Sequence, residues 1–193
     1  MQAQPGNIEV RNNLANALSD LNQLDEAMAH YDYVLTRQPR HANALNGSAV
    51  VLAMKHRLPE AKARLEESLR LAPDNASAHN NLGNVCSMLG DRETAIRHYQ
   101  RATEMKPQDA HPFFLIGSLL NQQEKFAEAV PVLQRAVALR PVNPDALAQL
   151  GLALARLGRR EEALRALQTA LQQRPGDAQA QAWIEAVQAM PVR

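Results

Sequence analysis

The chain has 193 residues, 46% of them hydrophobic, and a formal net charge of +1, values that exclude a disordered protein and argue against a nucleic-acid binder. A single cysteine, Cys86, excludes a disulfide framework and a multi-cysteine metal site. No apolar run approaches the roughly 18 residues of a membrane span and no signal peptide opens the sequence, so we expect a soluble, cytoplasmic protein without a membrane partner.

Prolines recur every 34 residues, at Pro5, Pro39, Pro73, Pro107, Pro141 and Pro175. A fixed period in this range is typical of stacked-repeat proteins. We therefore divide the chain into a remnant of a preceding repeat loop at 1–7, five repeats at 8–41, 42–75, 76–109, 110–143 and 144–177, and a capping helix with its tail at 178–193. The partial repeat at the start suggests a segment of a longer protein.

The sequence pattern of each repeat predicts two helices joined by a tight turn. In the third repeat, Ala78 and Leu82 belong to one helical stripe, and Ala95 belongs to the next. Between the stripes, Gly90 suits the end of a helix and Asp91 suits the cap that begins the following one. The closing proline prevents the second helix from continuing into the next repeat.

Residues at equivalent positions of the five repeats share size, which predicts packing between helices. Small residues fall at Ala15, Ala49, Gly83, Gly117 and Gly151, and again at Ala27, Ala61, Ala95, Ala129 and Ala163. Large residues fall at Tyr31, Leu65, Tyr99, Leu133 and Leu167. A further packing column contains Leu14, Ser48, Leu82, Ile116 and Leu150.

These columns, written "NNLGNVCSMLG…A…Y…A…P" in the third repeat, resemble the tetratricopeptide repeat over nearly the whole chain. The resemblance implies an all-α, right-handed superhelical solenoid of helix-turn-helix units, with an inner groove lined by the first helix of each repeat. The family's usual aromatic residue near the start of that helix is present only as Phe113, and His79 occupies the place in the third repeat.

Catalytic and metal-binding patterns are missing from the sequence. The six histidines show no paired metal-ligand spacing, and no phosphate-binding glycine loop or nucleophile elbow occurs. Cys86 falls in an apolar stripe and is expected to pack in the core. We therefore expect no enzymatic activity, no cofactor and no metal in this chain.

Residues opposite the packing stripe of each first helix are expected to face the groove. Its N-terminal half is rich in asparagine, whose amide can bind both the C=O and the N–H of an extended peptide. Its C-terminal half is more apolar. The predicted peptide-binding residues are Asn12, Asn16, Asn46, Asn80, Asn81, Asn84, Met88, Phe114 and Ser118. In the alternative interpretation, these amides bond to neighbouring helices or to water.

The asparagine-lined groove resembles the repeat arm of O-linked N-acetylglucosamine transferase. The match is incomplete, because Gly47 and Leu115 interrupt one asparagine row, and Phe114 and Ala148 end the other. Because the groove of the first three repeats lacks lysine and arginine, a clamp for a terminal carboxylate is not expected. The sequence thus favours a protein–protein interaction module that binds an extended peptide. One alternative is the substrate-recruiting arm of a larger glycosyltransferase or sulfotransferase.

A second alternative is a self-assembling scaffold. We expect the chain to be either a monomer or a weak homo-oligomer that associates through the terminal helix. Trp183 is the candidate contact for that association. Its other expected role is to cover the apolar end of the repeat array.

Overall fold

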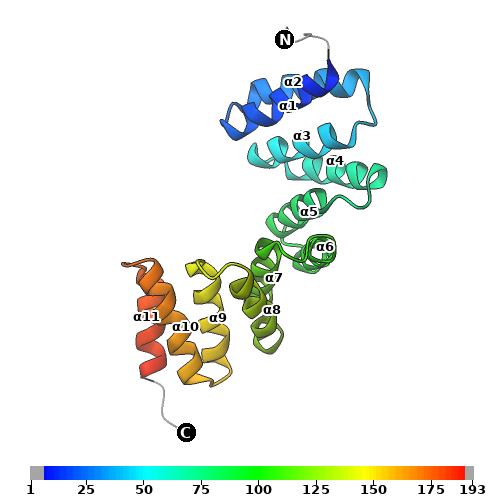
Figure 1. The fold of residues 1–193 in the computed structure, drawn as a ribbon. Helices are drawn as coiled ribbons and strands as arrows, with labels where there is room; N and C mark the ends of the chain where they lie inside the picture. Colours follow the sequence, from blue (N-terminus) through cyan, green and yellow to red (C-terminus); the bar gives the residue numbers. More distant parts are fainter. Residues whose placement is uncertain (1–6, 190–193) are drawn as a thin grey trace. The chain divides into compact units, whose positions relative to one another are not determined.

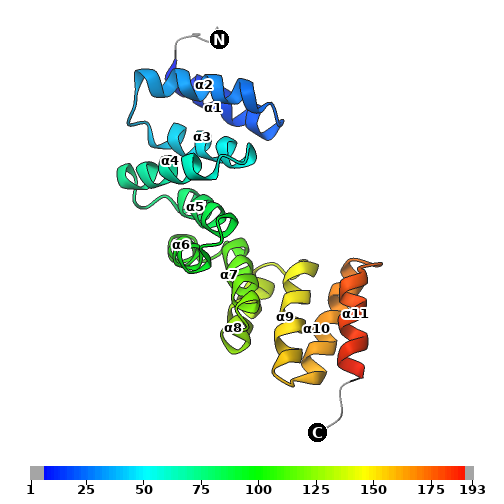
Figure 2. The same cartoon turned by 180° about the vertical axis from the view of Figure 1, so that it is seen from behind.

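The computed structural model describes residues 7–189, and this part of the chain is entirely helical, without strands. Its helices are α1 (Ile8–Asp20), α2 (Leu24–Arg37), α3 (Ala42–Met54), α4 (Leu58–Leu71), α5 (Ala76–Met88), α6 (Arg92–Met105), α7 (Ala110–Gln122), α8 (Phe126–Leu139), α9 (Pro144–Arg156), α10 (Arg160–Gln173) and α11 (Ala178–Gln188). Figures 1 and 2 show consecutive helices lying side by side in pairs. The predicted all-α, helix-turn-helix fold is confirmed. Most of the expected N-terminal remnant, 1–6, and the end of the tail, 190–193, lie outside the described residues.

The helices form two compact units, Met1–Met105 with α1 to α6 and Lys106–Arg193 with α7 to α11. We call the odd-numbered helices first helices and the even-numbered ones second helices. Within the N-terminal unit, α1 contacts α3 and α3 contacts α5, while in the C-terminal unit α7 contacts α9 and α9 contacts α11. Each unit therefore presents a series of adjacent first helices. Over residues 7–189, no helix combines the length and hydropathy that a membrane span requires.

A polar side chain caps the start of every first helix in residues 7–189. It accepts a hydrogen bond from a backbone N–H of the first turn, as Asn75 does from Ala78 at 3.1 Å. Such a cap stabilises a helix by about 0.5–2 kcal/mol. The caps are Asn7, His41, Asn75, Asp109, Asn143 and Asp177. Their spacing follows the proline period, so the same local signal starts each pair.

The turn inside each pair contains one residue in the left-handed region of φ. These residues are Asn22, His56, Gly90, Glu124 and Gly158. Only two are glycine, the residue that adopts this conformation without strain. In the third pair the turn behaves as expected, because Gly90 ends the helix and the Asp91 carboxylate accepts from the Thr94 N–H at 3.1 Å.

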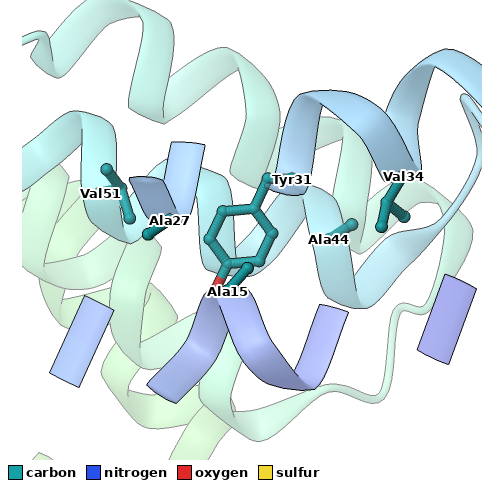
Figure 3. Packing of buried hydrophobic residues seen from close by; sticks show 6 residues of the cluster. All are labelled: Ala15, Ala27, Tyr31, Val34, Ala44 and Val51. Atoms are coloured by element: carbon teal, nitrogen blue, oxygen red, sulfur yellow. The ribbon is translucent and has the colours of Figure 1, made fainter. Parts of the chain in front are cut away.

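The core of each unit lies between first and second helices. In the N-terminal unit, Tyr31 of α2 lies at the middle of a buried cluster (Figure 3), whose other members are Ala15, Ala27, Val34, Ala44 and Val51. The alanines of the second-helix column are fully buried, as expected. Gly83 also has its expected role, since a Cβ added there would lie 2.5 Å from Cε1 of Tyr99.

One member of the predicted packing columns does not pack as expected. Leu14 is 44% exposed, whereas Leu82, at the equivalent position of α5, is 2% exposed. The difference arises because α4 covers α5, while no helix of the described residues precedes α1 to cover Leu14. Val10, on the same helix, is also exposed.

Candidate functional site

The predicted peptide-binding residues fall into the two units. Asn12 and Asn16 lie on α1, Asn46 on α3, and Asn80, Asn81, Asn84 and Met88 on α5, all in the N-terminal unit. Phe114 and Ser118 lie on α7 in the C-terminal unit. We therefore treat the first helices of each unit as a separate candidate surface.

Two asparagines of the N-terminal unit are held by tyrosines of the second helices. The Tyr31 hydroxyl donates to Oδ1 of Asn16 at 2.5 Å, and the Tyr99 hydroxyl donates to Oδ1 of Asn84 at 2.7 Å. Burial raises the pKa of Tyr31 to about 12 and also raises the pKa of Tyr99, so both hydroxyls stay protonated and keep donating.

This contact decides which end of each amide is offered to a ligand. The oxygen of each amide accepts from tyrosine, so the N–H groups of Nδ2 in Asn16 and Asn84 remain available to donate. Both residues are exposed. Val50, which is half-buried, occupies the equivalent position of α3 between them. The exposed side of the first helices of the N-terminal unit thus carries two oriented N–H donors with an apolar residue between them. We call these two residues the oriented amides.

Other amides join neighbouring first helices. Nδ2 of Asn81 on α5 donates to Oδ1 of Asn46 on α3 at 2.9 Å. In the C-terminal unit, Nδ2 of Asn121 on α7 donates to the backbone oxygen and to Oε1 of Gln149 on α9, both at 2.9 Å. We call these four residues the bridging amides. Two of them, Asn46 and Asn81, are predicted peptide-binding residues, and the bond between them occupies Oδ1 of Asn46 and one N–H of Asn81.

Three further predicted peptide-binding residues each have a buried polar atom. Oδ1 of Asn12, Oδ1 of Asn80 and Oγ of Ser118 are buried and have no hydrogen-bond partner among the described residues. Asn12 is only 3% exposed, so its amide is closed to a binding partner. Asn80 is half-buried, and Met88 is 53% exposed. Met88 therefore adds an open apolar side chain one turn beyond Asn84.

Gly47, which interrupts the asparagine row, has a packing role. A Cβ added to Gly47 would lie 2.6 Å from Cζ of Tyr31, well inside van der Waals contact. The phenol of Tyr31 thus extends past Ala15 to the surface of α3, and only a residue without a side chain leaves room for it. Gly47 thereby helps to place the hydroxyl that orients Asn16.

A pair of histidines connects α5 and α6. Nε2 of His79 donates to the carbonyl oxygen of Pro73 at 3.1 Å, so Nδ1 of the neutral ring is an acceptor. Nδ1 of His98 lies 2.9 Å from it and donates. Burial lowers the pKa of both histidines, and each is also influenced by charged neighbours. Those neighbours are Asp74, Arg101 and Glu104 for His79, and Lys62, Asp91 and Arg97 for His98.

The histidine pair predicts an acid-sensitive fold. A histidine whose pKa is lower in the folded than in the unfolded chain stabilises the fold fully above its unfolded pKa of 6.5, and this contribution is lost as the pH falls through that value. We expect the midpoint of urea unfolding to decrease between about pH 7.5 and about pH 5.5. The His79→Phe variant, which has the aromatic residue found at Phe113, should show a smaller decrease. As a control, replacing the exposed His111 by glutamine should leave the decrease unchanged, and an equal decrease in His79→Phe and the parent would contradict the assignment.

Neither a metal centre nor a reactive thiol emerges from the geometry. No three His, Cys, Asp or Glu side chains between residues 7 and 189 are grouped so that they could hold a metal ion. Cys86 is fully buried, and burial raises the pKa of its thiol, which disfavours the nucleophilic thiolate.

Comparison with known protein families agrees with the paired-helix fold. Three tetratricopeptide repeat models match the chain, over residues 12–61, 40–108 and 116–188. No curated protein sequence matches it.

Solved structures similar to this chain include YrrB, described as a tetratricopeptide repeat protein with an unusual peptide-binding site. YrrB is 29% identical, with 93% of this chain and 92% of YrrB covered and a TM-score of 0.77. A MamA structure is 19% identical, with 96% and 97% of the two chains covered and a TM-score of 0.76. The pilF protein of Pseudomonas aeruginosa is 18% identical, with 93% and 82% covered and a TM-score of 0.85. For MamA and pilF the similarity concerns the fold alone.

Proposed function

Because the chain belongs to the tetratricopeptide repeat family, whose models match most of its length, we propose that it is a protein-interaction module that binds an extended peptide segment of a partner. The surface that we assign to the peptide is the exposed side of α1, α3 and α5. The observation that carries the proposal is the pair of oriented amides, Asn16 and Asn84, on this surface.

The oriented amides fit the backbone of a peptide. A peptide in extended conformation presents carbonyl oxygens at regular intervals, and each can accept from a fixed N–H donor with little dependence on the side chain. Because tyrosine already fixes each amide, less conformational entropy is lost when a peptide binds. Val50 and Met88 lie beside the donors and offer apolar contacts for side chains. The description of YrrB as a peptide-binding protein, at 29% identity, supports the same function.

The proposal predicts the effect of removing the oriented amides. Peptides would first be selected on the parent chain from a displayed library of random dodecapeptides. Calorimetry would then measure their affinity for the parent and for the Asn16→Ala/Asn84→Ala variant. We expect about a tenfold or greater loss of affinity, because two hydrogen bonds of roughly 1 kcal/mol each are removed. The ratio of the two affinities should change little with salt, because the donors that the variant lacks are uncharged.

Two controls separate orientation from folding. Gln168→Ala removes an exposed amide from the second helix α10 and should leave peptide affinity unchanged. Tyr99→Phe keeps Asn84 but removes the hydroxyl that fixes it, so it should weaken binding less than loss of the amide does. The proposal is wrong if no library peptide binds, or if selected peptides bind the double variant as tightly as the parent.

Self-assembly is a second candidate, and one observation favours it. Val10 and Leu14 are exposed on α1 at positions that are buried in α5. Association of copies through this face would remove apolar surface from water. Light scattering over a range of concentrations tests it, since a constant monomer mass would exclude the candidate.

A further inference from the structure

The C-terminal unit contains a pocket of about 410 Å³ among its first helices. Phe114 of α7 and Gln149 of α9 line it together with Trp183 of α11. Its size lies within the range of sites that hold a small ligand or one large side chain. The pocket is separate from the oriented amides, which belong to the N-terminal unit.

Three charged side chains form the polar wall of the pocket. The Arg174 guanidinium donates to both oxygens of Asp145, at 2.8 and 2.9 Å, and more weakly to Oδ2 of Asp177 at 3.4 Å. The other oxygen of Asp177 caps α11 by accepting from the Gln179 and Ala180 N–H groups. The guanidinium lowers the pKa of Asp145, so this carboxyl stays ionised. Two carboxylates against one guanidinium leave the wall with one excess negative charge.

Aromatic side chains complete the pocket. Trp183 packs with one part against the buried cluster of Leu147, Ala148 and Ala170, and it also lines the pocket. Phe114 contributes a second ring. The face of an aromatic ring carries partial negative charge and attracts cations, most strongly when the ring is tryptophan. Aromatic rings beside a carboxylate therefore favour a positively charged occupant.

We propose that this pocket takes a lysine or arginine side chain of a partner segment. The cationic group of that side chain donates to Asp145, and its methylene stem lies against Trp183. The inference rests on the proposed function, because it assigns one side chain of the peptide partner. The second carboxylate makes the exchange feasible, since Arg174 keeps Asp177 as a partner when Asp145 turns to the ligand. The assigned specificity is for a basic partner segment.

The test uses the only tryptophan of the chain as the reporter. The indole fluorescence of Trp183 and its indole N–H signal in NMR would be followed while the full-length protein is titrated with acetyl-Ala-Arg-Ala-amide. The matched probes are the same tripeptide with citrulline, which has a similar shape without charge, and with glutamate. We expect the arginine peptide to bind about tenfold more tightly than the citrulline peptide, because a charge-assisted hydrogen bond replaces a neutral one. The difference should shrink at high salt.

Two substitutions should act in opposite directions. Asp145→Asn removes the negative charge and one of the two acceptor oxygens, so it should abolish the preference for arginine over citrulline. Arg174→Gln removes the internal competitor and should increase affinity for the arginine peptide. If Asp145 and Arg174 served only to stabilise the fold, both substitutions would weaken binding equally. Circular dichroism shows whether each variant is folded. Glu161→Gln, an equal change of charge on exposed α10, should have no effect.

The outcomes distinguish this inference from the proposed function. Equal binding of the arginine and citrulline peptides, tighter binding of the glutamate peptide, or no change at Trp183 would overturn the basic pocket. Library peptides that depend on Asn16 and Asn84 would still support the module in that case. Conversely, charge-selective binding at Trp183 together with failure of every library peptide would leave a cation-binding pocket but refute the peptide-binding module on which its partner assignment rests.

Discussion

Replacing Tyr99 by alanine is expected to lower the free energy of unfolding by about 3–5 kcal/mol, the largest effect we predict for a single substitution. The side chain is 1% exposed and fills the space against Gly83, where even a Cβ would lie 2.5 Å from the ring. Alanine would leave a cavity that a rigid pair of helices cannot close. Urea unfolding followed by circular dichroism measures the change.

Two milder variants at the same position test this explanation. Tyr99→Phe keeps the ring and removes only the hydrogen bond to Asn84, so it should cost about 1 kcal/mol. Tyr99→Leu introduces the residue found at Leu65, Leu133 and Leu167, and it should cost clearly less than alanine. If leucine were as damaging as alanine, the loss could not be attributed to the volume of the side chain.

Replacing Gly47 by alanine is expected to destabilise the N-terminal unit by about 1–3 kcal/mol, although alanine is the better helix former by about 1 kcal/mol. The added Cβ would overlap the Tyr31 phenol, which is itself 1% exposed and enclosed by the cluster of Figure 3. The ring can move away only by disturbing that cluster. Thermal and urea unfolding of the variant provide the measurement.

A double-mutant cycle isolates the overlap. In a Tyr31→Leu background the phenol is absent, so Gly47→Ala should become neutral or stabilising through its higher helix propensity. Gly117→Ala in the C-terminal unit is the matched comparison, because its added Cβ would approach Leu133 and not Tyr31. This substitution should therefore be equally destabilising in the parent and in the Tyr31→Leu background. A constant cost of Gly47→Ala in the two backgrounds would show that Tyr31 is not its cause.

The paired helices could be predicted from the sequence because they depend on local signals that recur. Proline, small-residue and large-residue columns each repeat at the same interval, and the structure buries Ala27 and Tyr31 as their columns imply. The left-handed turn residues were missed, since Asn22, His56 and Glu124 are not glycine. Their alignment with Gly90 and Gly158 was the available signal.

The chemistry of the site was less predictable, because an asparagine in a sequence does not show what its amide contacts. Asn46 and Asn81 looked equivalent to Asn16 and Asn84, yet the first two bond to each other. One signal could have separated them. Tyrosine at 31 and 99 coincides with asparagine at 16 and 84, whereas leucine at 65, 133 and 167 coincides with Val50, Ser118 and Leu152. The bridging contact of Asn121 depends on how two helices meet and has no such signature.

The buried thiol of Cys86 can report how often the surrounding helices open. A fully buried thiol reacts with an alkylating reagent only when α5 and its neighbours open, so the rate of modification in native buffer reports the opening free energy of the N-terminal unit. Trp183, the only tryptophan, lies in the other unit. The chain therefore carries one natural reporter of unfolding in each unit. Comparison of the two reporters in a single sample would measure how strongly one half of the chain depends on the other for its stability.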